Sequence, residues 1–123
     1  RCVVRGHNHF PQVRQWEGRT IVTCGSIGLP MDFNPAAQHA VLEEREGQWH
    51  TTHHAVPYDV DGALRRFEET AYLPDAGPMG RLFVRGVATA TNQVMPFFRY
   101  YRRWQKEGAI SLAEAVERFL SLY

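Results

Sequence analysis

The sequence predicts an α/β fold that is mostly β-strand in its first half and helical after residue 59. Short apolar runs alternate with polar residues on both sides of Glu17-Gly18, and again on both sides of Glu46-Gly47, which is typical of hairpins. After Asp59, apolar residues recur every three or four positions, which is typical of amphipathic helices. We therefore expect one domain, or part of one, in which the strands precede the helices.

Composition excludes several functional classes. Apolar residues make up 44% of the 123 residues, which is enough for a core, and a net charge of +1 argues against a surface that coats nucleic acid. The pairs Arg65-Arg66 and Arg102-Arg103 are interpreted as solvated helix faces. Cys2 and Cys24 lie in apolar strand contexts, so we expect free thiols. No apolar run reaches about 18 residues, so we expect no membrane association and a cytoplasmic location.

The first half of the chain reads as strands joined by tight turns. A short apolar strand, Cys2-Val3-Val4, opens it. A segment with two glycines and two prolines, from residue 25 to residue 35, is predicted to be a loop. The two predicted hairpins lie on either side of this loop, and their arms are Phe10 to Trp16 with Arg19 to Cys24, and Gln38 to Arg45 with Gln48 to Val56.

Helical patterns begin after Asp59, which is a plausible N-cap. Pro74-Asp75-Ala76-Gly77-Pro78 is expected to break the first helical pattern. A helix is then predicted from Met79 to about Asn92, and Pro96 is expected to kink or restart it. The apolar stripe of the first helix consists of Val60, Leu64, Phe67 and Ala71.

The last two helical segments carry most of the aromatic residues. The segment from Phe97 to Lys106 should end at Gly108, and Ser111 with Glu114 has the spacing of a capping box. The apolar face of the final helix is Leu112, Ala115, Val116, Phe119, Leu120 and Tyr123. The preceding segment has five aromatic residues, which at helical spacing indicate core or a subunit interface rather than a platform for nucleobases: Phe97, Phe98, Tyr100, Tyr101 and Trp104.

The candidate functional residues lie in Gly6-His7-Asn8-His9, directly after the first apolar strand. Two extended residues at i and i+2 project the same way, with Cα atoms about 6.5 Å apart. That separation suits two metals about 3.5–4 Å apart, each holding one imidazole, better than one shared ion. Gly6 permits close approach of a ligand. Taken alone, the spacing favours a surface loop with two solvated histidines over a metal site.

The other four histidines are interpreted as solvated or edge-strand residues. On the predicted strand Gln48 to Val56, His50 and His54 share one face and His53 lies on the other, so they cannot converge on one ion. His39 is interpreted in the same way.

Four segments occur in an order that resembles a known family: Val3 to Pro11, Arg19 to Pro30, Gln38 to Glu43, and Val56 to Asp59. The likeness is to the C-terminal part of the calcineurin-like metallophosphoesterases, especially the small bacterial and archaeal phosphodiesterases. In that family an apolar strand ends in Gly-His-x-His, a hairpin follows, and a later strand ends in an Asn-Pro-Gly-Ser type of loop. Here Thr23-Cys24 replaces the Asn-Pro of that loop.

The resemblance implies the C-terminal part of a two-sheet αββα sandwich, with a core over residues 1–73 and a helical extension over residues 74–123 packed on the same domain. It implies a hydrolase with two divalent ions, Mn²⁺ first and Fe, Zn, Ni or Mg as alternatives, each held by one of His7 and His9. Asn8, Gly25 and Ser26 become candidate substrate contacts. The substrate would be a phosphate ester or a nucleotide.

The family draws most of its ligands from motifs upstream of Gly-His-x-His, and these are absent here. We therefore expect the catalytic residues upstream of Arg1, in an N-terminal portion of the same protein, either continuous or as a separate chain, that covers the first strand. This chain alone is expected to be inactive. A homo-oligomer through the C-terminal aromatic helices is also expected. Two alternatives stay open: a catalytically inactive scaffold with this fold, and a nucleotide-binding regulatory module.

Overall fold

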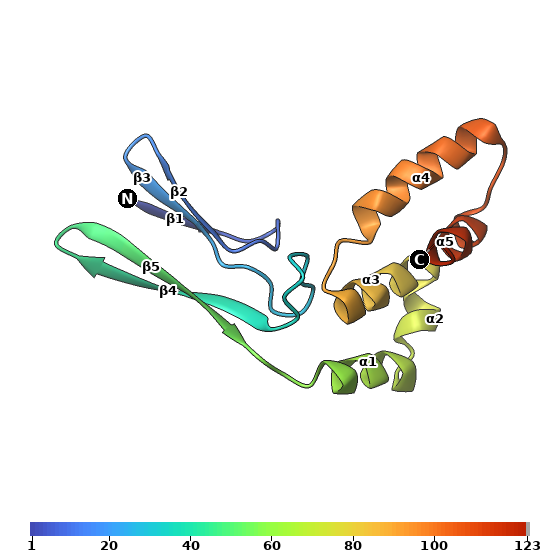
Figure 1. The fold of residues 1–123 in the computed structure, drawn as a ribbon, viewed down its shortest axis with the longest axis horizontal. Helices are drawn as coiled ribbons and strands as arrows, with labels where there is room; N and C mark the ends of the chain where they lie inside the picture. The colour runs from blue at the N-terminus through green and yellow to red at the C-terminus, as the bar shows by residue number, and fades with distance from the viewer. Residues whose placement is uncertain (123) are drawn as a thin grey trace. The chain divides into compact units, whose positions relative to one another are not determined.

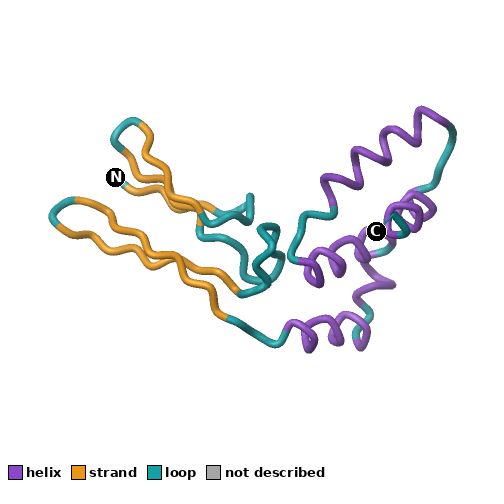
Figure 2. The backbone as a smooth tube through the Cα atoms, in the orientation of Figure 1, coloured by secondary structure: helices purple, strands orange, loops and turns teal. Residues whose placement is uncertain are grey.

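A computed structural model describes residues 1–122 as a mixed α/β chain (Figure 1). It divides into two compact units, Arg1–Tyr58 and Asp59–Tyr123, which we describe separately. The first unit contains all the strands and the second all the helices of the described residues (Figure 2). The predicted fold class is therefore confirmed.

The first unit begins with a three-stranded sheet in the order β1-β3-β2. Strand β1 (Cys2–Arg5) pairs in parallel with β3 (Arg19–Thr23), and β2 (Gln12–Trp16) pairs with β3 in the antiparallel direction. A second sheet consists of β4 (Ala37–Arg45) and β5 (Gln48–Val56), which form an antiparallel hairpin. The two predicted hairpins are thus present, and residues 25–35 connect them without helix or strand.

Both hairpins turn through a pair of residues with positive φ. The angles are 46° and 70° at Glu17 and Gly18, and 51° and 76° at Glu46 and Gly47. Two successive residues with positive φ define the type I′ turn, whose twist matches that of the strands it joins. Glycine in the second position of each turn meets this requirement at no steric cost, and the registers are fixed accordingly.

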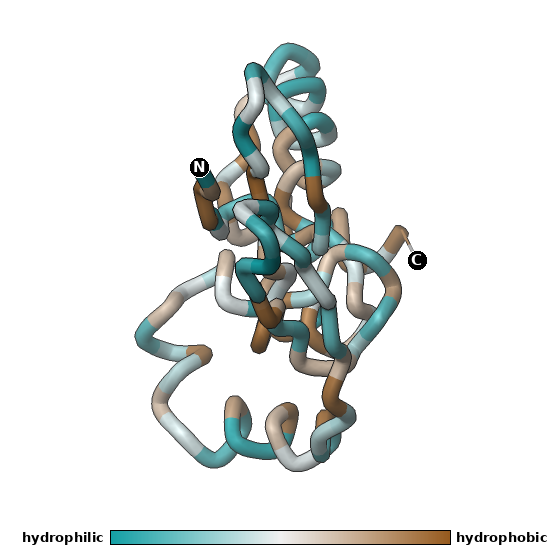
Figure 3. The backbone as a smooth tube through the Cα atoms, turned by 90° about the vertical axis from the view of Figure 1, so that its left-hand side faces the viewer, coloured by the Kyte–Doolittle hydropathy of each residue, from teal (hydrophilic) through white to brown (hydrophobic). Residues whose placement is uncertain are grey.

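Strand β1 lies at an edge of its sheet. Val3 is 46% exposed and Val4 is 54% exposed, although both are apolar. Figure 3 shows this hydrophobic run directly after the N-terminus. A row of unpaired backbone groups beside exposed valines is a surface that another strand can cover. Coverage by a further polypeptide stays a prediction.

Alternation on the second sheet separates its histidines. Gln38, Ala40 and Leu42 face inward on β4, as the pattern predicted for the last two. On β5 the half-buried His53 forms a hydrogen bond of 2.8 Å from Nε2 to the Thr23 carbonyl oxygen, which ties β5 to β3. His53 therefore has the edge-strand position that was one of the two expected roles, but it is not solvated, because sequence alone does not show which face meets the other sheet.

The opposite face of this hairpin carries the exposed histidines. His39 and His54 stand opposite each other, with ring centroids 5.1 Å apart, and His50 is exposed nearer the turn. These three therefore have the solvated positions that the alternation predicted.

Five helices form the second unit: α1 (Val60–Glu69), α2 (Tyr72–Ala76), α3 (Pro78–Thr89), α4 (Val94–Glu107) and α5 (Leu112–Leu120). Asp59 caps α1, since its carboxylate accepts a bond of 2.8 Å from the Gly62 amide. The predicted break over residues 74–78 is partly wrong, because Pro74 lies inside α2. Proline is tolerated in a first helical turn, where its missing N–H has no intrahelical acceptor. The first helical pattern ends earlier, at Glu69 with Thr70 as its C-cap, and a second break follows at Gly77, with φ 62° and ψ −160°.

The core of the helical unit is formed by residues of α3, α4 and α5. Phe97 and Trp104 of α4 are buried, so the interpretation of the aromatic residues as core is confirmed for these two. The ring of Phe97 stacks on Tyr101 at 5.5 Å and meets Phe119 edge-on at 5.7 Å. The buried cluster is Leu82, Phe97, Trp104, Ala115, Val116 and Phe119. The predicted contribution of Tyr123 lies outside the described residues.

Helices α1 and α2 contact α3, so they belong to the helical unit. The boundary between the compact units therefore follows Tyr58, whereas the resemblance placed the end of the core after residue 73. That family-based boundary stays a prediction. Among residues 1–122, no helix has the length and apolar character needed to span a bilayer.

We predict that Phe97→Ala lowers the free energy of unfolding by about 3–5 kcal/mol, because it empties a fully buried aromatic site. Phe98→Ala is the matched control, since Phe98 is 37% exposed, and its loss should be clearly smaller. Chemical denaturation of both variants checks this. Equal losses would contradict the assignment of Phe97 to the core.

The capping box at α5 yields a prediction about pH. The Ser111 hydroxyl donates to Glu114 Oε2 at 2.7 Å and the Ser111 amide donates at 2.9 Å, which together lower the pKa of Glu114 below its ordinary value. Because the pKa of Glu114 is lowered by folding, these bonds stabilise the folded chain at any pH above the ordinary pKa of glutamate. That stabilisation is lost as the pH falls through the lowered pKa. Ser111→Ala should raise the pKa of Glu114, as measured by NMR titration. Ser121→Ala, which does not touch Glu114, should leave it unchanged.

Candidate functional site

Two loops begin side by side at one edge of the first sheet. Because β1 and β3 run parallel, their carboxyl ends lie together: Arg5 pairs with Thr23, and the Cys24 amide donates to the Arg5 carbonyl at 3.4 Å. The loop with His7 and His9 leaves β1 there, and the loop with Gly25 and Ser26 leaves β3. Ligands in α/β sheets bind beyond the carboxyl ends of parallel strands. This pairing makes the two loops the candidate functional site.

The backbone of the histidine loop is left-handed at both histidines. The φ angles are 77° at His7 and 62° at His9, and the Asn8 amide closes a tight turn onto the Gly6 carbonyl at 3.1 Å. The expectation of two extended residues projecting the same way is therefore wrong, since β1 ends at Arg5. Positive φ in residues with a Cβ is strained, and such strain clusters at functional sites.

One ring nitrogen of His9 is fixed as a hydrogen-bond donor. Its Nδ1 lies 2.7 Å from the Leu29 carbonyl oxygen, and a carbonyl can only accept, so Nδ1 is the donor. In the neutral ring the lone pair is then on Nε2. Metal-binding histidines characteristically donate their second ring N–H to a carbonyl or carboxylate in this way, which fixes the ring for the ion. His9 is half-buried, whereas His7 is exposed.

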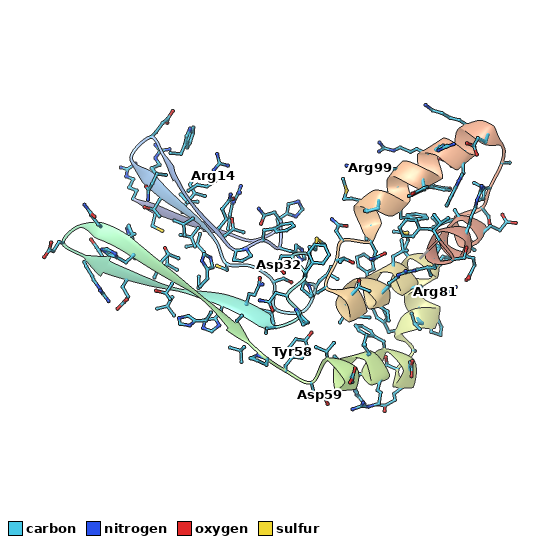
Figure 4. The ribbon with its side chains drawn as sticks, in the orientation of Figure 1. Arg14, Asp32, Tyr58, Asp59, Arg81 and Arg99 are labelled. Carbon is cyan, nitrogen blue, oxygen red and sulfur yellow. The ribbon has the colours of Figure 1, made fainter. Side chains whose placement is uncertain are left out.

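The second loop is fastened to β4 by Gln38. The backbone amide of Ser26 donates to Gln38 Oε1 at 3.2 Å, and the backbone amide of Gln38 donates to the Ser26 carbonyl at 2.9 Å. Gln38 Nε2 donates to Asp32 Oδ2 at 2.7 Å. Asp32, labelled in Figure 4, lies in the loop between β3 and β4. Gln38 is 4% exposed and Ser26 is 6% exposed. Sequence reasoning missed Gln38, although a glutamine at an inward position of an alternating strand is a usable signal.

The three candidate substrate contacts are engaged inside the loops. The Ser26 hydroxyl accepts from the Leu29 amide at 2.9 Å, and Asn8 Oδ1 accepts from the Phe10 amide at 3.3 Å. Gly25 has φ 94°, and a Cβ there would overlap Gln38 Oε1. These contacts give Asn8, Gly25 and Ser26 roles in loop structure. Their contact with a substrate stays a prediction.

The two histidines fit a metal as part of a larger ligand set. His9 has the required tautomer, and His7 lies two residues away at the same end of the sheet. Across residues 1–122, no three His, Cys, Asp or Glu side chains are grouped so that they could hold an ion. A catalytic metal usually needs at least three protein ligands, so further ligands are required.

Comparison with models of known protein families gives no match, and no curated protein matches the chain. Among solved structures, the chain is similar to a metallophosphoesterase from Sphaerobacter thermophilus, with a TM-score of 0.53 and 24% identity. The likeness covers 73% of this chain and 43% of that one, so the chain spans less than half of that protein. At this identity the comparison shows the fold alone. The chain has a metallophosphoesterase-like fold, as the Gly-His-x-His pattern and the strand order predicted.

We predict that Gly25→Ala destabilises the chain by at least about 1–2 kcal/mol, because φ is positive and the new methyl would overlap Gln38. Gly28→Ala is the control in the same loop, since a Cβ there meets nothing within 4 Å. Unfolding free energies of the two variants test the prediction. If the Gly25→Ala chain is as stable as the Gly28→Ala chain, the loop can adjust to a Cβ at position 25 and the prediction is wrong.

Proposed function

We propose that this chain supplies two histidine ligands, His7 and His9, to the dinuclear centre of a metal-dependent phosphoesterase. The observation that carries the proposal is the bond from His9 Nδ1 to the Leu29 carbonyl, which leaves Nε2 available at the carboxyl end of a parallel strand pair. The metallophosphoesterase-like fold supports it. The complete protein is then a hydrolase of phosphate esters, of the phosphodiesterase or phosphatase type.

A pair of divalent ions in such a centre supplies Lewis acidity and an activated water for in-line attack on phosphorus. The residues of this chain place the two imidazole rings where they could bind the ions. His9 presents Nε2 because Leu29 holds its other nitrogen, and His7 presents a ring from the same tight turn. The imidazoles must be neutral to bind, so acid competes with the ions. Mn²⁺ is the ion we propose first, with Fe, Zn, Ni or Mg as alternatives, because nitrogen and oxygen ligands accept all of them.

The remaining ligands and the catalytic groups come, in this proposal, from an N-terminal portion of the same protein. The exposed valines of the edge strand β1 support it, because a neighbouring strand would cover them. This chain alone is then inactive. Asn8, Gly25 and Ser26 are proposed to line the site for a phosphate ester or a nucleotide.

We also propose that copies of the chain associate through α4. Met95 is 59% exposed and Phe98 is 37% exposed on this helix, and exposed apolar and aromatic side chains favour interfaces.

We predict that His9→Ala weakens Mn²⁺ binding by at least about tenfold and that His7→Ala does the same, since changes that merely disturb a ligand cost about 10–100-fold. In the complete protein both variants should lose hydrolysis of a chromogenic phosphodiester. His50→Ala is the control, because His50 is exposed near the turn of the second hairpin. Metal analysis, activity and thermal melts should be measured together.

The melts separate the outcomes of this experiment. Loss of metal and activity with an unchanged melting temperature supports the proposal. Wild-type metal content and turnover in both variants would contradict it. A complete protein that binds no metal in its wild-type form would favour the inactive scaffold instead.

A further inference from the structure

Gln38 is the most fully engaged polar side chain near the candidate site. It is 4% exposed, its Oε1 accepts from the Ser26 amide, and its Nε2 donates to Asp32 Oδ2 at 2.7 Å. A buried side chain that must accept on one atom and donate on the other can be neither a carboxylate nor an aliphatic residue. Asparagine is shorter by one methylene and does not reach both partners from the same backbone position.

A continuous set of hydrogen bonds joins Gln38 to His9. Gln38 holds Ser26, and the Ser26 hydroxyl accepts from the Leu29 amide at 2.9 Å. The carbonyl of Leu29 in turn accepts from His9 Nδ1 at 2.7 Å. The direction of that carbonyl therefore depends on how the loop from Ser26 to Leu29 is held, and its only described fastening to a strand side chain is Gln38.

We propose that Gln38, oriented by Asp32, is a positioning residue for the metal ligand His9. Resting on the proposed function, the inference is that Gln38 fixes the Ser26–Leu29 loop, so that Leu29 holds His9 with the proton on Nδ1 and the lone pair on Nε2. The hydrogen bond made by one ring nitrogen decides which nitrogen carries the proton. Without the Leu29 carbonyl, the proton is free to move to Nε2, the atom that must bind the ion.

The test exchanges the two polar partners. Gln38→Glu keeps an acceptor for the Ser26 amide but places a second carboxylate against Asp32, so the loop should shift. Adding Asp32→Asn restores a donor opposite the new carboxylate, and the pair of changes should recover the wild-type arrangement. Gln48→Glu is the matched control, since Gln48 is an exposed glutamine at the start of β5.

The primary measurement is the nitrogen-15 NMR spectrum of the His9 ring in the metal-free 123-residue chain. It is recorded at a pH about two units above the ordinary pKa of a histidine side chain, so that the ring is neutral. Wild type and Gln48→Glu should hold the proton on Nδ1. Gln38→Glu should move a large share of it to Nε2, and Gln38→Glu with Asp32→Asn should return it. Mn²⁺ binding by the complete protein is the second measurement, and it should be about 10–100-fold weaker in Gln38→Glu than in wild type.

Ser26→Ala provides a second test in case the Gln38→Glu chain does not fold. It removes the acceptor for the Leu29 amide without adding charge, and it should also move the His9 proton. The inference is overturned if a folded Gln38→Glu chain keeps the wild-type tautomer, or if Gln38→Glu unfolds while Ser26→Ala leaves the tautomer unchanged. If the tautomer responds as expected but the complete wild-type protein binds no Mn²⁺, the positioning role stands and the proposed metal function fails.

Discussion

The parallel pairing of β1 with β3 is the constraint on which the candidate site depends. It aligns Arg5 with Thr23, so the two strands end together and release their loops at one edge of the sheet. Residues near position 8 and residues near position 26 then meet, although the β2–β3 hairpin separates them in the chain. An antiparallel pairing of β1 would send the two loops to opposite ends of the sheet. The bond between His9 and Leu29 would then be impossible.

Local strain and long-range hydrogen bonds offset each other in this site. Left-handed φ angles at His7 and His9 are unfavourable for residues with a Cβ, and the positive φ at Gly25 is acceptable only to glycine. The bonds of Gln38 and Ser26 hold the second loop in place, and the bond between His9 and Leu29 joins it to the first loop. This arrangement orients the His9 ring before an ion binds. The free-energy cost of ordering that ligand on binding is therefore lower.

The helical unit follows simpler rules. Its core forms from large apolar residues at helical spacing, with Phe97 and Phe119 in edge-on contact, and its last helix begins at a complete capping box. Among residues 59–122, positive φ angles occur only at helix ends, at Gly77 and Ala90. Its aromatic residues therefore serve packing first, and the exposed Phe98 is the part left for an interface.

Local chemistry in the sequence determined the elements: the residue pairs at the two I′ turns, the cap at Asp59, the capping box at Ser111 and the helical spacing of apolar residues were all visible without a structure. The Gly-His-x-His pattern likewise indicated the fold that the comparison supports. Tertiary structure alone decided three things: the left-handed turn at the histidines, the hydrogen bond from the half-buried His53 to β3, and the fastening of the second loop by Gln38. Each depends on partners 12 or more residues away or on which face of a sheet is covered. Periodicity and capping are short-range properties, so they can be read along the chain, whereas such contacts exist only once the strands have taken their register.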